Sequence, residues 1–233
     1  MHTMETLFDR PNKDKTFCSS IKPSKYEQSY SKNDTELFST LIELFLSRYD
    51  PAYSLLDDKE KELYILQKIA SISSEIDEKS DTRYTNFNYC KKFKSSLIQT
   101  GLQINDSISS VLYLNDLYKI TTVVIQGSTK YTTSPKNYKN YYITKNKGKW
   151  MEITNIEQDK FSEGSFDELG SMFVLDYPNI HIHQPFLKPI QNYKADELVE
   201  IAKELNISLT LDGKKKIKKQ LYNDINICKL NLM

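Results

Sequence analysis

The chain has 233 residues, and its 32 basic and 31 acidic side chains leave a formal net charge of +1. This length suits one ordinary domain with a small additional module. The balanced charge excludes a global basic field, so any nucleic-acid binding has to arise from local patches. The three scattered cysteines argue against a zinc site or a disulfide framework and favour a reducing, intracellular compartment.

The start of the chain predicts neither a secretory signal nor a membrane anchor. No apolar stretch approaches the roughly 18 residues of a membrane span, so we expect no membrane partner. Residues 1–32 are polar and predict a flexible N-terminal arm. Its sparse aromatic residues would anchor a protein partner. They are Phe8, Phe17, Tyr26 and Tyr30.

Helical patterns follow, with apolar residues recurring every three or four positions. They predict helices over Thr35–Arg48 and Asp58–Ile76. A third helix over Tyr89–Thr100 is expected to end at Gly101, and a fourth begins after Asn105-Asp106. The residues expected on the inner faces of the first two are Leu37, Leu41, Leu44, Phe45, Leu63, Leu66, Ile69, Ala70 and Ile76.

The hydrophobic period then changes from helical to that of short strands. Four strands are predicted, over Ile120–Gln126, Lys130–Thr133, Tyr141–Lys145 and Trp150–Thr154. We interpret them as a small antiparallel β-meander on which the N-terminal helices pack. Residues 33–176 would thus form an α+β body.

An acidic segment, Ile156–Asp176, follows the strands. It is either a linker or an acidic surface that contacts the basic meander. The next stretch, 177–190, contains three prolines and predicts an extended linker. Residues 191–233 would then form a separate helical module.

The module begins with a helix whose apolar stripe ends at Leu205 and is followed by Asn206, a residue that often terminates helices. The segment Ile207–Leu211 alternates between apolar and polar residues and predicts an extended link. Asp212-Gly213 marks a turn, after which Asp212 would cap a second helix. The stripe of this second helix is Ile217, Leu221 and Ile225.

Five lysines in six positions crowd the expected start of the second helix. Helix N-termini carry partial positive charge and prefer acidic side chains, so a docked anion would explain the cluster. The DNA backbone is the obvious polyanion. The alternatives are a solvated lysine-rich face and a protein-docking module. The predicted phosphate-binding residues are Gly213, Lys214, Lys215, Lys216, Lys218 and Lys219.

At these residues the chain resembles the SAP motif, a helix–extended–helix module named after SAF-A/B, Acinus and PIAS. The matching features are the segment Glu197–Ile207, the Gly-Lys-Lys junction and the segment Lys218–Ile225. The resemblance implies binding of double-stranded DNA through the loop and the start of the second helix. The residue pattern of this segment is also similar to C-terminal modules in proteins of large DNA viruses. The preference for lysine over arginine in the chain is typical of A/T-rich genomes.

A second basic stretch lies between Gly127 and Trp150, where six lysines and several tyrosines occur without an acidic residue. Lysines with aromatic neighbours can track a phosphate backbone while bases stack. The alternative is ordinary strand chemistry, with lysines guarding an exposed edge. The residues of this second candidate surface are Lys136, Tyr138, Lys139, Tyr141, Lys145 and Lys147.

Catalytic signatures are weak. Cys90 at an expected helix start, with His181 or His183 downstream, has the outline of a papain-like thiol hydrolase. The two histidines would chelate a metal only if a carboxylate such as Asp176 came close. No nucleotide-binding or hydrolase motif is present, so we expect no cofactor and no metal.

Three hypotheses remain open at this stage. The first is a DNA-binding protein, of viral origin, that uses the C-terminal lysines. The second is a structural or assembly protein of a virion. The third is a thiol hydrolase that uses Cys90.

Overall fold

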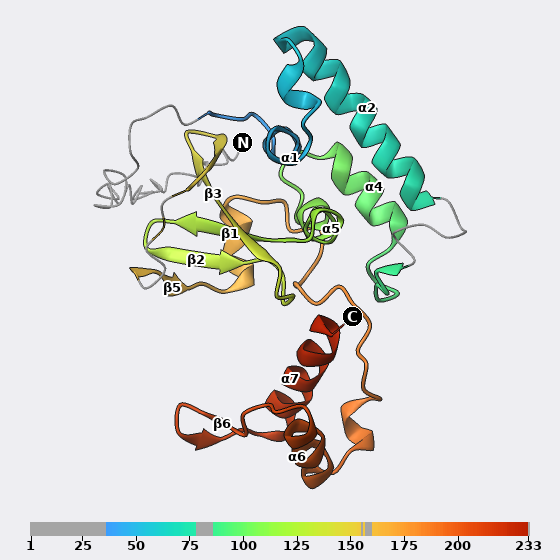
Figure 1. Ribbon diagram of the computed structural model, residues 1–233, viewed down its shortest axis with the longest axis vertical. Coiled ribbons are helices and arrows are strands. Elements are labelled where there is room, and N and C mark those ends of the chain that lie inside the picture. Colours follow the sequence, from blue (N-terminus) through green and yellow to red (C-terminus); the bar gives the residue numbers. More distant parts are fainter. Residues whose placement is uncertain (1–35, 78–85, 155, 157–159, 233) are drawn as a thin grey trace, which may run out of the picture.

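The computed structural model describes residues 36–77, 86–154, 156 and 160–232, so the predicted N-terminal arm lies outside it. Two parts are visible, a larger α+β body and a smaller C-terminal module that contains the last two helices (Figure 1). The predicted α+β class is therefore confirmed. Within the described residues, no helix is both long and apolar enough to cross a membrane.

Within the described residues the body contains four principal helices, and the first and third of them differ from the sequence prediction at their ends. Helix α1 begins only after Thr40, because Phe38 exchanges two backbone hydrogen bonds of 2.8 Å with Trp150. Helix α4 contains Gly101 rather than ending at it. A Cβ there would meet Ser109 Oγ at 2.2 Å, so this close approach requires glycine. The helices are α1 (Leu41–Tyr49), α2 (Asp58–Asp77), α4 (Ser95–Gln103) and α5 (Ile108–Tyr118).

A five-stranded sheet has the order β4-β3-β1-β2-β5. The predicted simple meander is wrong, because β3 pairs in parallel with β1 instead of following β2. The hydrogen bonds of Thr133 to Asn115 and Thr122 help to direct the chain from β2 back to the start of β1. The strands are β1 (Ile120–Gln126), β2 (Thr129–Thr132), β3 (Lys139–Asn146), β4 (Lys149–Glu152) and β5 (Ser162–Glu163).

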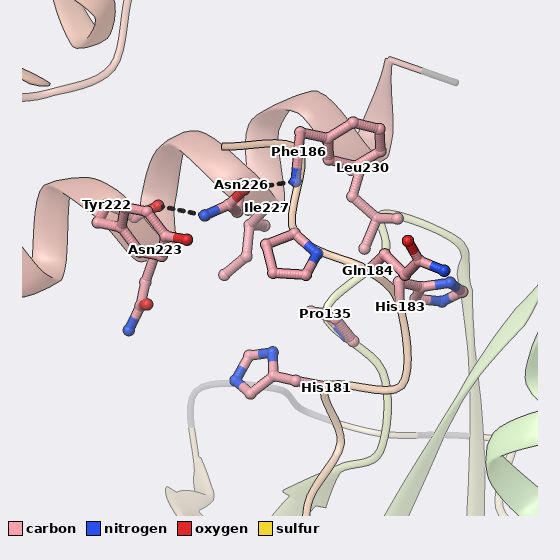
Figure 2. A pocket seen from close by; sticks show the side chains of 11 residues that line it. Pro135, His181, His183, Gln184, Phe186, Tyr222, Asn223, Asn226, Ile227 and Leu230 are labelled. Carbon is pink, nitrogen blue, oxygen red and sulfur yellow. Dashed lines mark hydrogen bonds between the residues drawn. The ribbon is translucent and has the colours of Figure 1, made fainter. Parts of the chain in front are cut away.

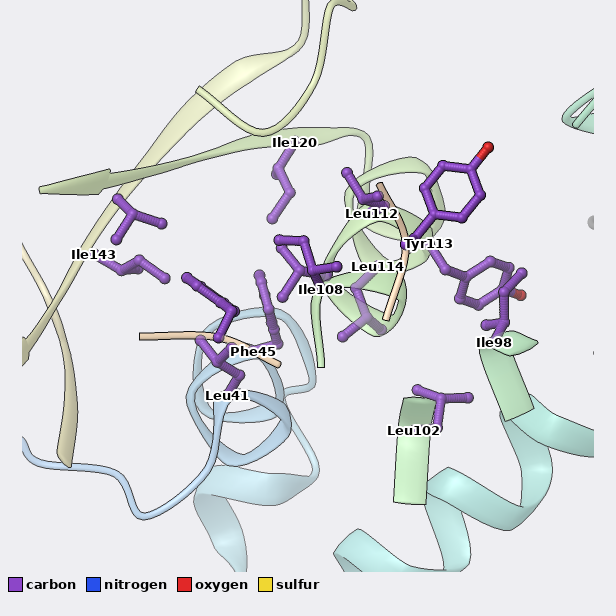
Figure 3. Packing of buried hydrophobic residues seen from close by; sticks show 14 of the residues in the cluster. Leu41, Phe45, Ile98, Leu102, Ile108, Leu112, Tyr113, Leu114, Ile120 and Ile143 are labelled. Carbon is purple, nitrogen blue, oxygen red and sulfur yellow. The ribbon is translucent and has the colours of Figure 1, made fainter. Parts of the chain in front are cut away.

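Helix α5 packs on both strand β1 and helix α4, and side chains of α1 join the same core (Figure 3). Every residue from Ile108 to Asp116 is buried, as expected for a helix that is apolar on most sides. Its neighbours come from both layers, which makes one continuous core. Labelled members are Leu41, Phe45, Ile98, Leu102, Leu112, Leu114, Ile120 and Ile143.

Helix α2 is covered over only part of its length. Leu63 and Leu66, predicted to face the core, are 59% and 62% exposed. The buried residues of this helix are Ile72 and Ile76 near its C-terminal end, where it packs on α4. Periodicity correctly predicted a helix here, but it could not show how far its neighbours extend.

The predicted linker, 177–190, belongs in its first half to the body. Tyr177 and Ile182 are buried in the main core, and His183 pairs with Tyr89 in a short antiparallel bridge. This pairing also explains why helix α4 starts later than Tyr89. The acidic segment before it contributes β5, where Glu163 forms a 2.9 Å ion pair with Lys130. Contact with the basic strands was one of the two alternatives for that segment.

The C-terminal module comprises α6 (Ala195–Glu204), β6 (Thr210–Leu211), β7 (Lys214–Lys215) and α7 (Lys218–Asn231). Asn206 terminates helix α6 as predicted, since it directly follows the C-cap Leu205 and adopts a positive φ of 55°. The N–H of Ile207 donates to Ala202 O and that of Asn206 to Lys203 O, which together form a Schellman motif. The module has its own core of Leu187, Leu198, Ala202, Leu221 and Ile225.

Two asparagines of α7 tie the module to the rest of the chain. Asn226 Oδ1 accepts hydrogen bonds from the N–H groups of Phe186 and Leu187, at 2.8 and 3.0 Å. Asn231 Oδ1 accepts one from Asn137 N–H, at 2.6 Å, in the loop between β2 and β3. The helix is therefore fixed against both the connecting segment and the body.

Candidate nucleic-acid interface

The lysine cluster lies on a β-hairpin and on the first turn of the helix that follows it. Strands β6 and β7 are joined by Asp212-Gly213, whose φ angles are 50° and 74°. Positive φ at both central residues is the geometry of a type I′ turn, for which Asp-Gly is a preferred sequence. Asp212 therefore shapes the hairpin. The sequence prediction that Asp212 caps the second helix is wrong.

The second helix starts later than predicted, with Ile217 at its N-cap and Lys218 as its first residue. Ile217 is 62% exposed and has no side-chain acceptor for the first-turn N–H groups. Gln220 Oε1 accepts from Ile217 N–H at 2.9 Å, which satisfies one donor outside the helix proper. The N-terminus of α7 thus keeps donors and partial positive charge that an anion would stabilise.

The five lysines do not all have the same surroundings. Lys216 Nζ lies 2.8 Å from Asp224 Oδ2, and its side chain is only 11% exposed, so this lysine is structural. For the other four, no carboxylate lies within ion-pair distance among the residues that the structure describes. Of these, Lys214, Lys215 and Lys219 are exposed, and Lys218 is half-exposed.

The charge of the module is divided between its two helices. Helix α6 carries four exposed acidic residues, whereas the hairpin and the start of α7 carry the lysines. Gly213 lies at the tip of the hairpin, between the two strands. A polyanion would therefore be attracted to the hairpin end and repelled from α6. The acidic residues are Asp196, Glu197, Glu200 and Glu204.

The second predicted surface, on the strands, is not assembled as an array of free lysines and tyrosines. Lys136 Nζ lies 2.8 Å from Asp116 Oδ1 and 3.2 Å from Tyr138 OH. Lys145 Nζ pairs with a carboxylate oxygen of Asp106. Asp106 precedes α5, and Asp116 lies near its C-terminal end. Both are far in sequence from their lysine partners, so the sequence did not predict these ion pairs.

The remaining residues of that surface differ in burial, so they do not form one exposed surface. Tyr141 is buried, at 4% exposure, and burial raises its pKa well above the ordinary range. Trp150, part of the same stretch, is fully buried and donates from Nε1 to Asp106 Oδ1 at 2.6 Å. Of the six residues predicted for this surface, only Lys139 and Lys147 are exposed. Neither of the two tyrosines in the set is exposed.

The residues of the thiol-hydrolase hypothesis are placed apart. Cys90 Sγ lies 3.1 Å from Tyr177 OH, in an extended stretch rather than at a helix start. His183 is directed to Asp116, and His181 has an exposed side chain. No histidine hydrogen bonds to the thiol within the described part of the chain, so a Cys–His pair is not formed.

The metal hypothesis required Asp176 near the two histidines. Asp176 instead accepts hydrogen bonds from Ser107 Oγ at 2.7 Å and Ser109 N–H at 2.9 Å. These bonds hold the start of α5. Across the described residues, no group of three metal-ligating side chains comes together.

Sequence reasoning missed a buried polar network at the end of α5. Asp116 is 2% exposed, and its two oxygens face Lys136 and His183, with His183 Nε2 at 3.2 Å. Burial alone would raise the pKa of Asp116. The hydrogen bond and charge of His183, together with the Lys136 ammonium group, lower it below its ordinary value. An aspartate in a mostly apolar helix was the available signal, because buried charges require partners.

Comparison with known proteins adds no further constraint. No protein family, no curated protein and no solved structure matches this chain. The assignment of function therefore depends on the residues of the molecule itself.

Proposed function

We propose that this protein binds the phosphate backbone of DNA through four lysines, Lys214 and Lys215 of the hairpin and Lys218 and Lys219 of the first turn of α7. The observation that carries the proposal is the position of these four lysines beside a helix start without a side-chain cap. Lysines in the first turn are unfavourable next to the helix dipole. A phosphate would compensate both the dipole and the mutual repulsion of the ammonium groups.

The resemblance to SAP modules supports DNA as the polyanion. Two helices enclose a small core in this module, and the basic residues lie on the connection and on the start of the second helix. The connection here is a β-hairpin, which is a departure from a simple extended link. The hairpin presents backbone and lysines rather than a recognition helix, so the contacts are expected to be largely independent of base sequence.

The first experiment measures binding of a fluorescent DNA duplex to the full-length chain over a range of salt concentrations. Four phosphate contacts predict that log K falls with log salt with a slope of about −3 to −4. Replacing the four lysines together by glutamate should weaken binding by about a hundredfold or more at 100 mM salt, since each contact contributes to the slope.

The matched control changes the same number of charges elsewhere. Lys91, Lys92, Lys188 and Lys194 are exposed, and their joint replacement by glutamate alters the net charge equally. This control should retain most of the affinity if the hairpin is the interface. Equal losses in the two variants would indicate only a general effect of net charge. Absence of binding at low salt would contradict the proposal and favour the assembly hypothesis.

A further inference from the structure

A pocket of about 270 Å³ lies between helix α7 and the segment that leads into the module (Figure 2). One wall is formed by α7, and the other by the segment His181–Phe186. Pro135, from the loop between β2 and β3, closes a third side. The wall residues of α7 are Tyr222, Asn223, Asn226, Ile227 and Leu230.

The lining of the pocket contains no aspartate, glutamate, lysine or arginine. Its apolar surface comes from Pro135, Pro185, Ile227 and Leu230, with Phe186 as an aromatic neighbour. A pocket without formal charge does not favour a phosphate or a carboxylate. Its volume is slightly below the range of about 300–1,000 Å³ that is typical for drug-sized ligands, so it suits a single neutral ring system.

The polar groups of the pocket divide into occupied and open ones. Asn226 is occupied, because its oxygen accepts two backbone N–H groups and its nitrogen donates to Tyr222 O at 2.9 Å. His183 is directed to Asp116 and to the Phe87 carbonyl. The side chains of His181 and Asn223 are exposed and make no hydrogen bond to another described residue.

These open groups match the chemistry of a nucleobase. The Asn223 amide offers a donor and an acceptor side by side, the pattern with which asparagine recognises adenine in two hydrogen bonds. The His181 ring and the flat apolar walls offer stacking surfaces. Figure 2 shows the His181 ring below Ile227, with the Asn223 side chain also projecting from α7 on that lower side.

We propose that this pocket receives one unpaired base of the DNA whose phosphates the four lysines of the hairpin and of the start of α7 hold. This inference rests on the proposed function. With a rise of 1.5 Å per residue, the stretch Asn223–Leu230 lies about 8–18 Å along α7 from Lys218. At about 3.4 Å per stacked nucleotide, a strand spans that distance with a few nucleotides. Phosphates would stay on the lysines while the base enters the uncharged pocket.

Three DNA probes test the inference with the full-length chain. The first is a matched duplex, the second contains one extra unpaired adenine, and the third has an abasic analogue at that same position. The chain should bind the adenine probe at least fivefold more tightly than the other two, because stacking of a base on protein rings is worth about 1–3 kcal/mol. The abasic probe separates base recognition from simple flexibility of the duplex.

Two pocket variants and one control locate the effect. Asn223→Ala removes the open amide, and Ile227→Trp fills the space. Both should bind all three probes with the affinity that the wild type has for the matched duplex. Asn192→Ala replaces an exposed asparagine outside the pocket and should keep the preference for adenine. Circular dichroism of each variant checks the fold.

The outcomes separate the inference from the proposed function. Equal wild-type binding to the three probes would overturn base recognition but leave phosphate binding in place. A preference for adenine that persists in both pocket variants would locate the base elsewhere and overturn the inference as well. No binding to any probe at low salt would overturn both proposals.

Discussion

The lysines of the body strands and those of the C-terminal hairpin both form basic stretches in the sequence but have opposite surroundings in the fold. In the body, Lys136 and Lys145 point inward to Asp116 and Asp106, with side-chain exposures of 11% and 21%. On the hairpin, Lys214 and Lys215 are exposed, and no carboxylate among the described residues pairs with them. A lysine-rich stretch therefore predicts a phosphate-binding surface only where the fold supplies no internal anion.

Aromatic residues reinforce this contrast. Lys136 Nζ lies 5.3 Å from the ring centre of Tyr138, and Lys145 Nζ lies 5.0 Å from that of Trp150. The combination of lysine and aromatic side chains that suggested base stacking thus stabilises the interior of the body. In the hairpin, the corresponding ammonium groups remain open to a ligand.

The largest effect on the free energy of unfolding is expected when a buried lysine is replaced. An exposed lysine, replaced in a separate variant, serves as the comparison. Lys136→Met leaves the buried Asp116 without its ammonium partner, and should lower the free energy of unfolding by about 3–5 kcal/mol. Lys215→Met should change it by no more than about 0.5 kcal/mol. Urea denaturation followed by circular dichroism measures both values. Similar small losses would show that Lys136 is in effect solvated.

A smaller effect is expected at the junction between the two regions. Asn226→Ala removes the acceptor of two backbone N–H groups and should lower the free energy of unfolding by about 1–3 kcal/mol. Asn223→Ala, one turn earlier and exposed, serves as the control and should leave stability nearly unchanged. Hydrogen exchange at Phe186 and Leu187 would report the local opening. Unchanged protection in Asn226→Ala would mean that water replaces the amide.

The hairpin turn should show an effect of about 1 kcal/mol. Gly213 has a φ of 74°, and alanine is strained there, whereas no atom lies near enough to clash with its Cβ. Gly213→Ala should therefore loosen the hairpin through backbone strain alone. Asp212→Asn should be neutral, because asparagine also accepts positive φ. Thermal unfolding of both variants tests this, and a stable Gly213→Ala protein would contradict the assigned turn.

The smallest effect concerns pH, since it reflects one carboxyl group among several. The folded-state pKa of Asp116 is lower than its ordinary value of 3.8. Its ionised form therefore stabilises the fold fully above that value, and the contribution is lost as pH falls below it through the folded-state pKa. Subtracting the acid unfolding curve of Asp116→Asn from that of the wild type isolates this group. A difference that does not change between pH 4 and 2 would contradict the assignment.

Local patterns were sufficient where a structural element depends on its own residues. The α+β class, the helix of the segment 58–77 and the end of α6 at Asn206 were predicted correctly, because periodicity and capping act within a few positions. The Asp212-Gly213 turn was also predicted. Its role was not, since a hairpin and a helix cap use the same residue types.

Local sequence patterns could not predict the pairing between distant segments. The parallel register of β3 on β1 depends on how residues 133–138 cross back over the sheet. The docking of the segment 177–184 depends on the strand position of Tyr89. Neither contact leaves a signal within a window of sequence, because the interacting residues are tens of positions apart.

For this protein, the sequence by itself determined which segments are helical or extended and where the lysines are concentrated. Only the tertiary structure decided which of those lysines meet a carboxylate and which remain free for a polyanion. The physical reason is that secondary structure follows from interactions over three or four residues, whereas burial and ion pairing depend on contacts between distant segments. Asp116 neutralises Lys136 across 20 positions, and Lys215 has no such partner within the described chain.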